Sequence, residues 1–436
     1  MKKMSGFPEF LPEGRMVEQA VLAELQRTFE LHGFASIETR ALEPMASLAR
    51  KGDIGKEVYV VRRLHAPEGA PAELGLHFDL TVPFARYVVE NAGHLEFPFR
   101  RYQIQKAWRG ERPQDGRYRE FLQADVDIVG QGELALHHDI ELPLVALEAL
   151  ARLEEFGVPP AVMRLNNRKL SEGFYRGLGV SDPLAVLQRV DKLDKFGPDA
   201  VAAALREDLG MSPAAAAACL SLAEIKAPDG SFADRVRKLG VGGELLESGL
   251  DELGQVMESL AAYAPGQAVA DLSVARGLDY YTGTVYETAL RGMEALGSVS
   301  SGGRYDSLAA DGKHTYPGVG LSIGVSRILV PLIGKGALTA SRKVPSCVLV
   351  AVDSEASRAE SMAIAAKLRA RGIPAEVSPS ADKYGKQIRY ADRRGIPFVW
   401  FGAEVKDIRS GEQIAADPDI WDPPSQDLRA IVRTDA

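Results

Sequence analysis

The sequence predicts an α+β protein, in which an antiparallel core is interrupted by a helical insert and followed by a small α/β domain. Three observations support this fold class. Residues 97–130 are typical of two strands joined by a polar loop, without the strand–helix repeat of a parallel sheet. Residues 165–262 are rich in Ala, Leu, Asp and Lys at helical spacing, and residues 344–436 alternate strand and helix patterns.

Length and composition agree with several folded domains. A chain of 436 residues is too long for one ordinary core, and 46% apolar with 26% charged residues is a globular balance. The net charge of -8 argues against a protein that coats nucleic acid by charge alone, so DNA is not an expected partner.

Two basic clusters stand out against this acidic background. Residues 367–409 contain ten Lys or Arg against five Asp or Glu, and residues 100–119 contain seven against two. Such clusters favour anionic ligands bound at chosen places. Solvated helix faces are the alternative explanation of the first cluster.

Cysteine and histidine usage excludes several metal and redox sites. Cys219 and Cys347 are the two cysteines and lie far apart, and the seven histidines are scattered, so we expect neither a disulfide framework nor a transition metal. No stretch of eighteen uncharged apolar residues occurs, and the N-terminus lacks the apolar core of a signal peptide. We therefore expect a cytoplasmic protein without a membrane partner.

The first part of the core is predicted to span residues 1–164. Apolar residues every four positions predict a helix that ends at Gly33: Val17, Val21, Leu25 and Phe29. Strand patterns follow at 34–42 and 57–64, and a strand-to-helix passage at 74–90, before the hairpin.

After the helical insert of residues 165–262, strand patterns return and the same core is expected to resume over residues 263–335. This part ends in a strand of small residues that passes into an apolar helix, at 318–333. A short linker at 334–343 then leads to the α/β domain of residues 344–436.

Three arginines occur where the pattern is strand-like or apolar: Arg109, Arg276 and Arg327. A guanidinium in apolar surroundings is costly unless an anion meets it. Each alone is explained as well by a structural ion pair. Together with Arg117 and Glu111 they suggest a triphosphate clamp, because phosphoryl and adenylyl transfer depend on positioning and charge neutralisation.

Two common nucleotide-binding motifs are excluded. Neither GKS nor GKT occurs, so the Walker phosphate loop is absent. Gly318, Gly320 and Gly324 form G-x-G-x-x-x-G, which misses the dinucleotide spacing by one residue.

Several segments resemble a known set of motifs. "WRGERPQDGRYREF" resembles motif 2 of the class II aminoacyl-tRNA synthetases, and "GVGLSIGVSRI" resembles motif 3, with Arg327 as its arginine. "ARGLDYYTG" and "SSGGRYDSL" resemble the signature segments of the histidyl-tRNA synthetase family, which "HFDLTVPFARYV" and "NNRKL" also match. "YADRRGIPFV" resembles the C-terminal domain of that family, whereas "GFPEFLPEGR" departs from the usual motif 1 pattern G-x-R-D-x-x-P.

The resemblance implies a catalytic core of the class II synthetase type, an antiparallel sheet flanked by helices. It also implies a helical insert that reaches toward the tRNA, an anticodon-binding C-terminal domain and a homodimer. The implied reaction joins histidine and ATP into histidyl-adenylate and then charges tRNA(His). ATP is the implied substrate and Mg²⁺ the implied cofactor, for which no side-chain ligand is assigned.

The resemblance also implies roles for single residues around ATP. Arg109 and Arg276 would face the α-phosphate from two sides, and Arg117 and Arg327 would hold the γ-phosphate. Phe121 would stack on adenine, and Glu111 would lie near the adenylate and the incoming ribose.

The implied histidine site contains Asp79, Thr81 and Gln123 around the α-amino group, and Asp127, Tyr280 and Tyr281 around the ring. Arg276 is also implied to contact histidine. Both acids are Asp where some family members carry Glu, which leaves a direct or a water-mediated contact open. In the tail, the implied tRNA contacts are Lys383, Lys386, Arg389 and Arg393, with Tyr384 or Tyr390 available for stacking.

Two alternatives remain open at this point. One is a catalytically silent regulatory subunit of ATP phosphoribosyltransferase, which shares this catalytic fold but generally lacks the tail. The other is a class II synthetase of different specificity, which the paired tyrosines oppose. The role of Asp279 also remains open, as either an orienting group or a partner of an arginine.

Overall fold

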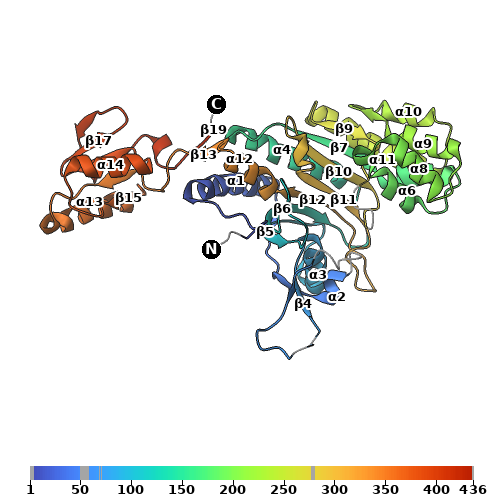
Figure 1. Ribbon diagram of the computed structural model, residues 1–436, viewed down its shortest axis with the longest axis horizontal. Coiled ribbons are helices and arrows are strands. Elements are labelled where there is room, and N and C mark those ends of the chain that lie inside the picture. The colour runs from blue at the N-terminus through green and yellow to red at the C-terminus, as the bar shows by residue number, and fades with distance from the viewer. Residues whose placement is uncertain (1–3, 50–57, 68, 70, 276–279, 435–436) are drawn as a thin grey trace. The chain divides into compact units, whose positions relative to one another are not determined.

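The computed structural model describes residues 4–49, 58–67, 69, 71–275 and 280–434 (Figure 1). The chain forms two compact units. One contains the residues up to Pro8 together with Leu22–Pro331, and the other contains Glu9–Val21 and the residues from Leu332 onward. No helix in the described part of the chain has the length and apolar character needed to cross a membrane.

A mixed central sheet organises the first unit. Its strand order in the described residues is β1-β5-β6-β12-β11-β10-β7-β9-β8. Neighbouring strands are antiparallel except β1 with β5 and β7 with β9. The bounds, in that order, are Ala35–Ser36, Phe99–Trp108, Glu120–Val129, Gly318–Gly324, Ser300–Tyr305, Thr284–Leu290, Ala161–Asn167, Ala268–Asp271 and Lys226–Ala227. The predicted α+β core is therefore confirmed, with parallel pairs added toward both edges.

The hairpin of β5 and β6 is the longest strand pair of this sheet. It pairs Phe99 with Val129 at one end and Trp108 with Glu120 at the other, so the polar loop of residues 109–119 projects from its tip. The hairpin therefore confirms the two strands and the polar loop around Pro113 to Gly116 that the sequence predicts.

Helices cover the central sheet where apolar stripes allow it. α4 (His137–Arg152) packs on β12, β6 and β7. α1 (Pro12–Leu31) buries the predicted stripe Val17, Val21, Leu25 and Phe29, and Gly33 follows it with a positive φ of 75°. α12 (Val325–Gly334) begins directly where β12 ends, so the strand and the helix are continuous in the chain.

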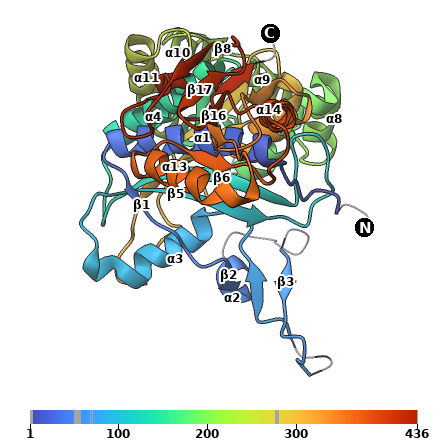
Figure 2. The same cartoon turned by 90° about the vertical axis from the view of Figure 1, so that its left-hand side faces the viewer.

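A three-stranded sheet of order β2-β4-β3 lies apart from the central sheet (Figure 2). Its strands are Leu42–Pro44, Leu74–Leu76 and Val60–Val61, and α2 (Met45–Leu48) packs beside it. The chain passes from β4 into α3 (Thr81–Asn91), which buries Val82, Phe84 and Val88.

Seven helices and the short strand β8 make up the described region between β7 and β9, shown in green to yellow-green in Figure 1. They are α5 (Arg168–Gly177), α6 (Pro183–Val190), α7 (Leu193–Phe196), α8 (Pro198–Glu207), α9 (Pro213–Ala223), α10 (Phe232–Arg237) and α11 (Glu244–Tyr263). α5 and α11 pack closely because Gly249 lacks a Cβ, which would lie 2.1 Å from the Leu170 nitrogen.

The second unit has a five-stranded sheet of its own, of order β15-β14-β16-β17-β18. The strands are Ala375–Val377, Val348–Val350, Phe398–Phe401, Glu404–Asp407 and Gln413–Ala415. α13 (Arg358–Ala370) and α14 (Tyr384–Arg394) provide the crossovers between the parallel strands, as expected for an α/β domain. β19 (Val432–Thr434) returns to pair with β13 (Leu338–Ala340) in the linker.

Candidate functional site

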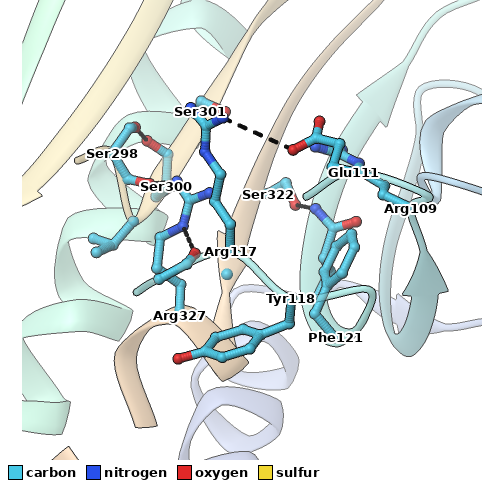
Figure 3. Close-up of a pocket in the computed structure, with 14 residues that line it drawn as sticks. Arg109, Glu111, Arg117, Tyr118, Phe121, Ser298, Ser300, Ser301, Ser322 and Arg327 are labelled. Atoms are coloured by element: carbon cyan, nitrogen blue, oxygen red, sulfur yellow. Dashed lines mark hydrogen bonds and ion pairs between the residues drawn. The ribbon is translucent and has the colours of Figure 1, made fainter. Parts of the chain in front are cut away.

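A pocket opens where the hairpin loop meets the central sheet (Figure 3). It is lined by Arg109, Glu111, Gly116, Arg117, Tyr118, Phe121, Gln123, Ser298, Val299, Ser300, Ser301, Ser322, Gly324 and Arg327. The loop after β5, the strands β6, β11 and β12, and the start of α12 all contribute. The four residues of this lining that were expected to bind ATP are thus brought together with Glu111 and Gln123. Arg327 comes from a distant part of the chain, whereas the others lie within residues 109–123.

Arg327 is held in the pocket by main-chain oxygen atoms. Its Nε donates to the Gly116 carbonyl at 2.7 Å, and its Nη1 donates to the Ser298 carbonyl. Since Gly116 belongs to the hairpin loop, this contact ties the loop to the first turn of α12. These two main-chain oxygens orient the guanidinium.

Arg109 lies on the opposite side of the pocket, directly after β5. Its Nε donates to the Phe78 carbonyl at 3.0 Å, and its guanidinium carbon lies 5.2 Å from the centre of the Phe121 ring. Arg117 reaches in from the loop with its Nη1 3.9 Å from a Glu111 carboxylate oxygen. Three cations therefore face a pocket in which Glu111 is the one carboxylate among the described lining residues.

A row of polar side chains continues from this pocket into the sheet. Alternate residues of a strand share one face, so β6 presents Phe121, Gln123, Asp125 and Asp127 on the same side. Gln123 donates to Ser322 Oγ of β12 at 2.6 Å, which joins the row to the neighbouring strand.

Two carboxylates at the far end of this row are buried. Asp125 and Asp127 are both 3% exposed. Burial raises the pKa of Asp125 to about 7 despite the opposing charge of Arg101. Burial also raises the pKa of Asp127, while Arg101 and the hydroxyl of Tyr305 lower it.

The paired tyrosines lie beside these carboxylates. Tyr280 and Tyr281 have ring centres 4.3 Å apart and pack against a buried cluster that includes Tyr305. Burial raises the pKa of Tyr281 well above its usual value, and the charge of Asp127 contributes to that rise. Tyr281 therefore lies within electrostatic reach of Asp127 and remains a neutral phenol near pH 7.

Asp79 and Thr81 lie where β4 passes into α3. Asp79 is buried and accepts a hydrogen bond from the Val82 amide at 3.1 Å, which caps the first turn of α3. Its charge raises the pKa of both Asp125 and Asp127, so the three carboxyl groups are electrostatically coupled. Thr81 is the first residue of α3 and is half-buried.

Two groups of residues singled out from the sequence remain to be placed. Arg276 and Asp279 lie outside the described residues. The four basic residues expected to bind tRNA belong to the second unit, where α14 exposes Lys386, Arg389 and Arg393 and Lys383 precedes it.

Sequence reasoning missed Arg101, Asp125 and Tyr305, which together surround Asp127. The register pairs Arg101 with Asp127 and Gln103 with Asp125 across the hairpin. Alternating polar residues on two strands predicted to pair would have been the available signal.

The comparisons with known proteins match this arrangement. A family model described as histidyl-tRNA synthetase matches residues 6–328, which is well over half of the chain. The chain belongs to the histidyl-tRNA synthetase family. A second model, described as anticodon binding domain, matches residues 346–402.

Relatives within the histidyl-tRNA synthetase family match over nearly the whole length. The histidine–tRNA ligase of Cutibacterium acnes is 62% identical, with 98% of both chains covered. That of Micrococcus luteus is 58% identical, covering 98% of this chain and 97% of the relative.

Solved structures give the same result at the level of the fold. The histidyl-tRNA synthetase from Nostoc sp. PCC 7120 aligns with a TM-score of 0.84 at 32% identity, covering 96% of this chain and 97% of that chain. The predicted class II fold with a C-terminal anticodon-binding domain is confirmed. An ATP phosphoribosyltransferase regulatory subunit/histidyl-tRNA synthetase from Bacillus halodurans C aligns at 20% identity with a TM-score of 0.74, a likeness of fold alone.

Proposed function

We propose that this protein attaches histidine to tRNA(His) in two steps. The histidine carboxylate attacks the α-phosphorus of ATP, and pyrophosphate leaves. The terminal ribose hydroxyl of the tRNA then attacks the carbonyl carbon of the adenylate, and AMP leaves. Membership of the histidyl-tRNA synthetase family supports this reaction, and the convergence of Arg109, Arg117 and Arg327 on one pocket is the observation that carries it.

The cationic pocket suits a triphosphate because two anions must approach each other in the first step. Arg109 and Arg276 are proposed to neutralise the α-phosphate, and Arg117 and Arg327 the γ-phosphate. Phe121 is proposed as the stacking surface for adenine; its ring also lies against the Arg109 guanidinium. Glu111 lines the pocket and is proposed to lie near the adenylate and the incoming ribose.

The polar row on β6 suits histidine. Asp79, Thr81 and Gln123 are proposed to hold the α-amino group, and Asp127 with Tyr280 and Tyr281 to read the imidazole ring. We propose that the amino end of histidine lies toward ATP and its ring toward the sheet. Gln123 lines the pocket and Asp127 is buried, which supports this orientation. Arg276 is proposed to contact histidine as well as the α-phosphate.

Mg²⁺ is proposed to accompany ATP. The described residues contain no group of three His, Cys, Asp or Glu side chains that could hold a metal ion. Glu111 is the carboxylate in the pocket, so the ion would be held mainly by phosphate oxygens and water, with Glu111 as the available protein ligand. When bound, Mg²⁺ would neutralise charge on the phosphates.

The exposed basic residues Lys383, Lys386, Arg389 and Arg393 are proposed to contact the tRNA backbone. Lys386 also pairs with Asp382 at 2.9 Å, a surface ion pair that phosphate can displace at small cost. Tyr384 is exposed and stacks edge-on with Phe401, whereas Tyr390 is half-buried against the core, so Tyr384 is the better candidate for base stacking.

The regulatory-subunit alternative is not favoured, because relatives at 62% and 58% identity are histidine–tRNA ligases over nearly their whole length. We further propose that residues 1–164, 165–262, 263–335 and 344–436 form separate functional parts.

We also propose that the protein is a cytoplasmic homodimer. Light scattering of the purified protein at several concentrations tests the dimer: a mass near 47.1 kDa throughout would contradict it.

ATP–pyrophosphate exchange, measured with each amino acid separately, tests the proposed reaction. We expect exchange with histidine alone, since a site built to hydrogen-bond both ring nitrogens excludes side chains that leave those groups unpaired. Exchange with a different amino acid but not histidine would contradict the specificity. Absence of exchange with any amino acid would contradict the enzyme assignment.

A further inference from the structure

Arg101 is a fully buried arginine at the floor of the proposed histidine site. It lies in β5 at 0% exposure, and its Nη2 is 2.7 Å from Asp127 Oδ2. Its Nη1 donates to Gln103 Oε1 at 3.3 Å, and its guanidinium lies 4.1 Å from the centre of the Phe84 ring. Burying a guanidinium is strongly unfavourable unless an opposite charge faces it, so this placement requires a strong compensating contact.

Both carboxylate oxygens of Asp127 are held. Oδ2 faces Arg101, and Oδ1 accepts a hydrogen bond from the Tyr305 hydroxyl at 2.8 Å. Gly320 on β12 faces the same oxygen, and a Cβ there would lie 2.0 Å from it. Three strands therefore fix the orientation of one carboxylate, and its remaining lone pairs are aimed rather than free to rotate.

The charges around Asp127 are unbalanced without Arg101. From the other elements packed against it, Asp127 faces Asp79 before α3, Tyr305 on β11 and Tyr281; Asp125 lies two residues away on its own strand. Among these described neighbours of Asp127, two are carboxyls, two are phenols and none is a cation. Arg101 is thus the cation that opposes protonation of both Asp125 and Asp127.

We infer that Arg101 is a positioning residue for histidine recognition: it keeps Asp127 ionised and, together with Tyr305, aims it as the acceptor for an imidazole N–H. This inference rests on the proposed role of Asp127 in reading the ring. Arg101 does not itself contact the substrate in this proposal. Burial alone favours the protonated form of Asp127. Arg101 counteracts this effect and fixes the orientation of the carboxylate as an acceptor.

Replacement of Arg101 tests the inference in the full-length enzyme. We expect Arg101→Gln to raise KM for histidine by at least about tenfold in ATP–pyrophosphate exchange, since charge-assisted hydrogen bonds contribute about 1.5–3 kcal/mol. KM for ATP should change less than about twofold. Arg101→Lys retains the charge but not the forked geometry, and should recover part of the loss.

Arg100→Gln is the matched control. Arg100 is the neighbouring residue of β5 on the opposite face, and its Nη2 is 2.6 Å from Glu141 Oε1. The Arg100→Gln variant loses an ion pair of similar length that lies away from the proposed histidine site, so its KM for histidine should stay unchanged. Equal rises in the Arg100 and Arg101 variants would overturn the inference, because any lost ion pair in β5 would then suffice.

The pH profile separates an electrostatic role from a purely structural one. Ionised Asp127 is a much stronger acceptor than its protonated form, and removing Arg101 raises its pKa further, so the ionised form is lost at higher pH. The acidic limb of kcat/KM for histidine should therefore move upward, by about one unit or more, in Arg101→Gln. In Asp127→Asn, adding Arg101→Gln should no longer move the limb. An unmoved limb in the single variant would overturn the inference.

Tyr305→Phe gives a test that survives if the Arg101 variants fail to fold. It removes a single oxygen atom and the hydrogen bond to Asp127 Oδ1, and should raise KM for histidine with unchanged KM for ATP. An unchanged KM for histidine would contradict the proposal that Arg101 and Tyr305 together orient Asp127. Failure of wild-type enzyme to exchange with histidine would instead contradict the proposed function, so the two failures are distinguishable.

Discussion

At the scale of single residues, the pocket orients two of its cations with neutral main-chain oxygen atoms. Arg109 is hydrogen-bonded to the Phe78 carbonyl, and Arg327 to the carbonyls of Gly116 and Ser298. Neutral acceptors fix a guanidinium in place without contributing a negative charge of their own. The proposed histidine site works in the opposite way, because Asp127 is paired with Arg101 before substrate arrives.

Arg276→Ala should slow adenylate formation by orders of magnitude while histidine binding persists, weakened only by loss of the one contact proposed for Arg276, because a preorganised cation at the α-phosphate acts chiefly on the transition state. Single-turnover adenylate formation and equilibrium histidine binding are the two measurements. Wild-type rates in this variant would remove Arg276 from the phosphate site.

Arg117→Ala should raise KM for ATP by about tenfold or more, from loss of a charge-assisted contact to phosphate. The side chain of Arg117 is 54% exposed, so the melting temperature should not change. Arg112→Ala is the control: Arg112 is exposed in the same loop and does not line the pocket. If both variants raise KM equally, the effect comes from the general charge of the loop.

At the scale of elements, glycines on β12 make room for the residues that surround the ring site. A Cβ at Gly318 would lie 2.4 Å from the Tyr305 ring, and one at Gly320 would lie 2.0 Å from Asp127 Oδ1. Both glycines belong to the G-x-G-x-x-x-G pattern that does not fit a dinucleotide loop. In this fold they serve close packing between strands instead.

Gly320→Ala should therefore weaken histidine binding. The added Cβ would displace Asp127, whose two oxygens both have partners, so the side chain can rotate away only by losing those contacts. We expect KM for histidine to rise by about tenfold or more, together with some loss of stability. Gly334→Ala is the control, since Gly334 is exposed at the end of α12 and a Cβ there meets nothing within 4 Å. Equal KM values in the two variants would contradict the packing argument.

At the scale of the whole molecule, the pocket and the basic residues of α14 belong to different compact units. The proposed chemistry of adenylate formation uses residues of the first unit alone. The second unit has its own sheet and its own buried core, which includes Val348, Val350 and Trp400. This separation predicts that the two steps of the reaction depend differently on the C-terminal domain.

Deletion of residues 344–436 should reduce tRNA charging far more than ATP–pyrophosphate exchange, by a further factor of about ten or more, because tRNA contacts are lost while the pocket remains. Both rates are to be measured on the same preparation. Equal losses in the two assays would mean that the domain is chiefly structural. Charge reversal at the exposed Arg389 and Arg393 offers a folded variant for the same comparison.

Much of this protein is readable from local pattern. Apolar periodicity predicts α1, polar turn residues predict the β5–β6 hairpin, and Ala-rich spacing predicts the helices between β7 and β9. The sequence also indicates the arginines of the pocket, since a guanidinium in apolar surroundings requires an anionic partner. These features depend on neighbours within a few turns or within one motif, which the sequence displays directly.

The tertiary structure decided what surrounds Asp127. Tyr305 lies 178 residues away along the chain, and Gly320 opposes Asp127 only because β12 pairs with β6 in one register. A slip of one residue would turn every side chain of the strand to the other face. The sequence by itself therefore determined the family, the fold class and the cations, whereas long-range strand register decided how Arg101 and Tyr305 aim a buried carboxylate.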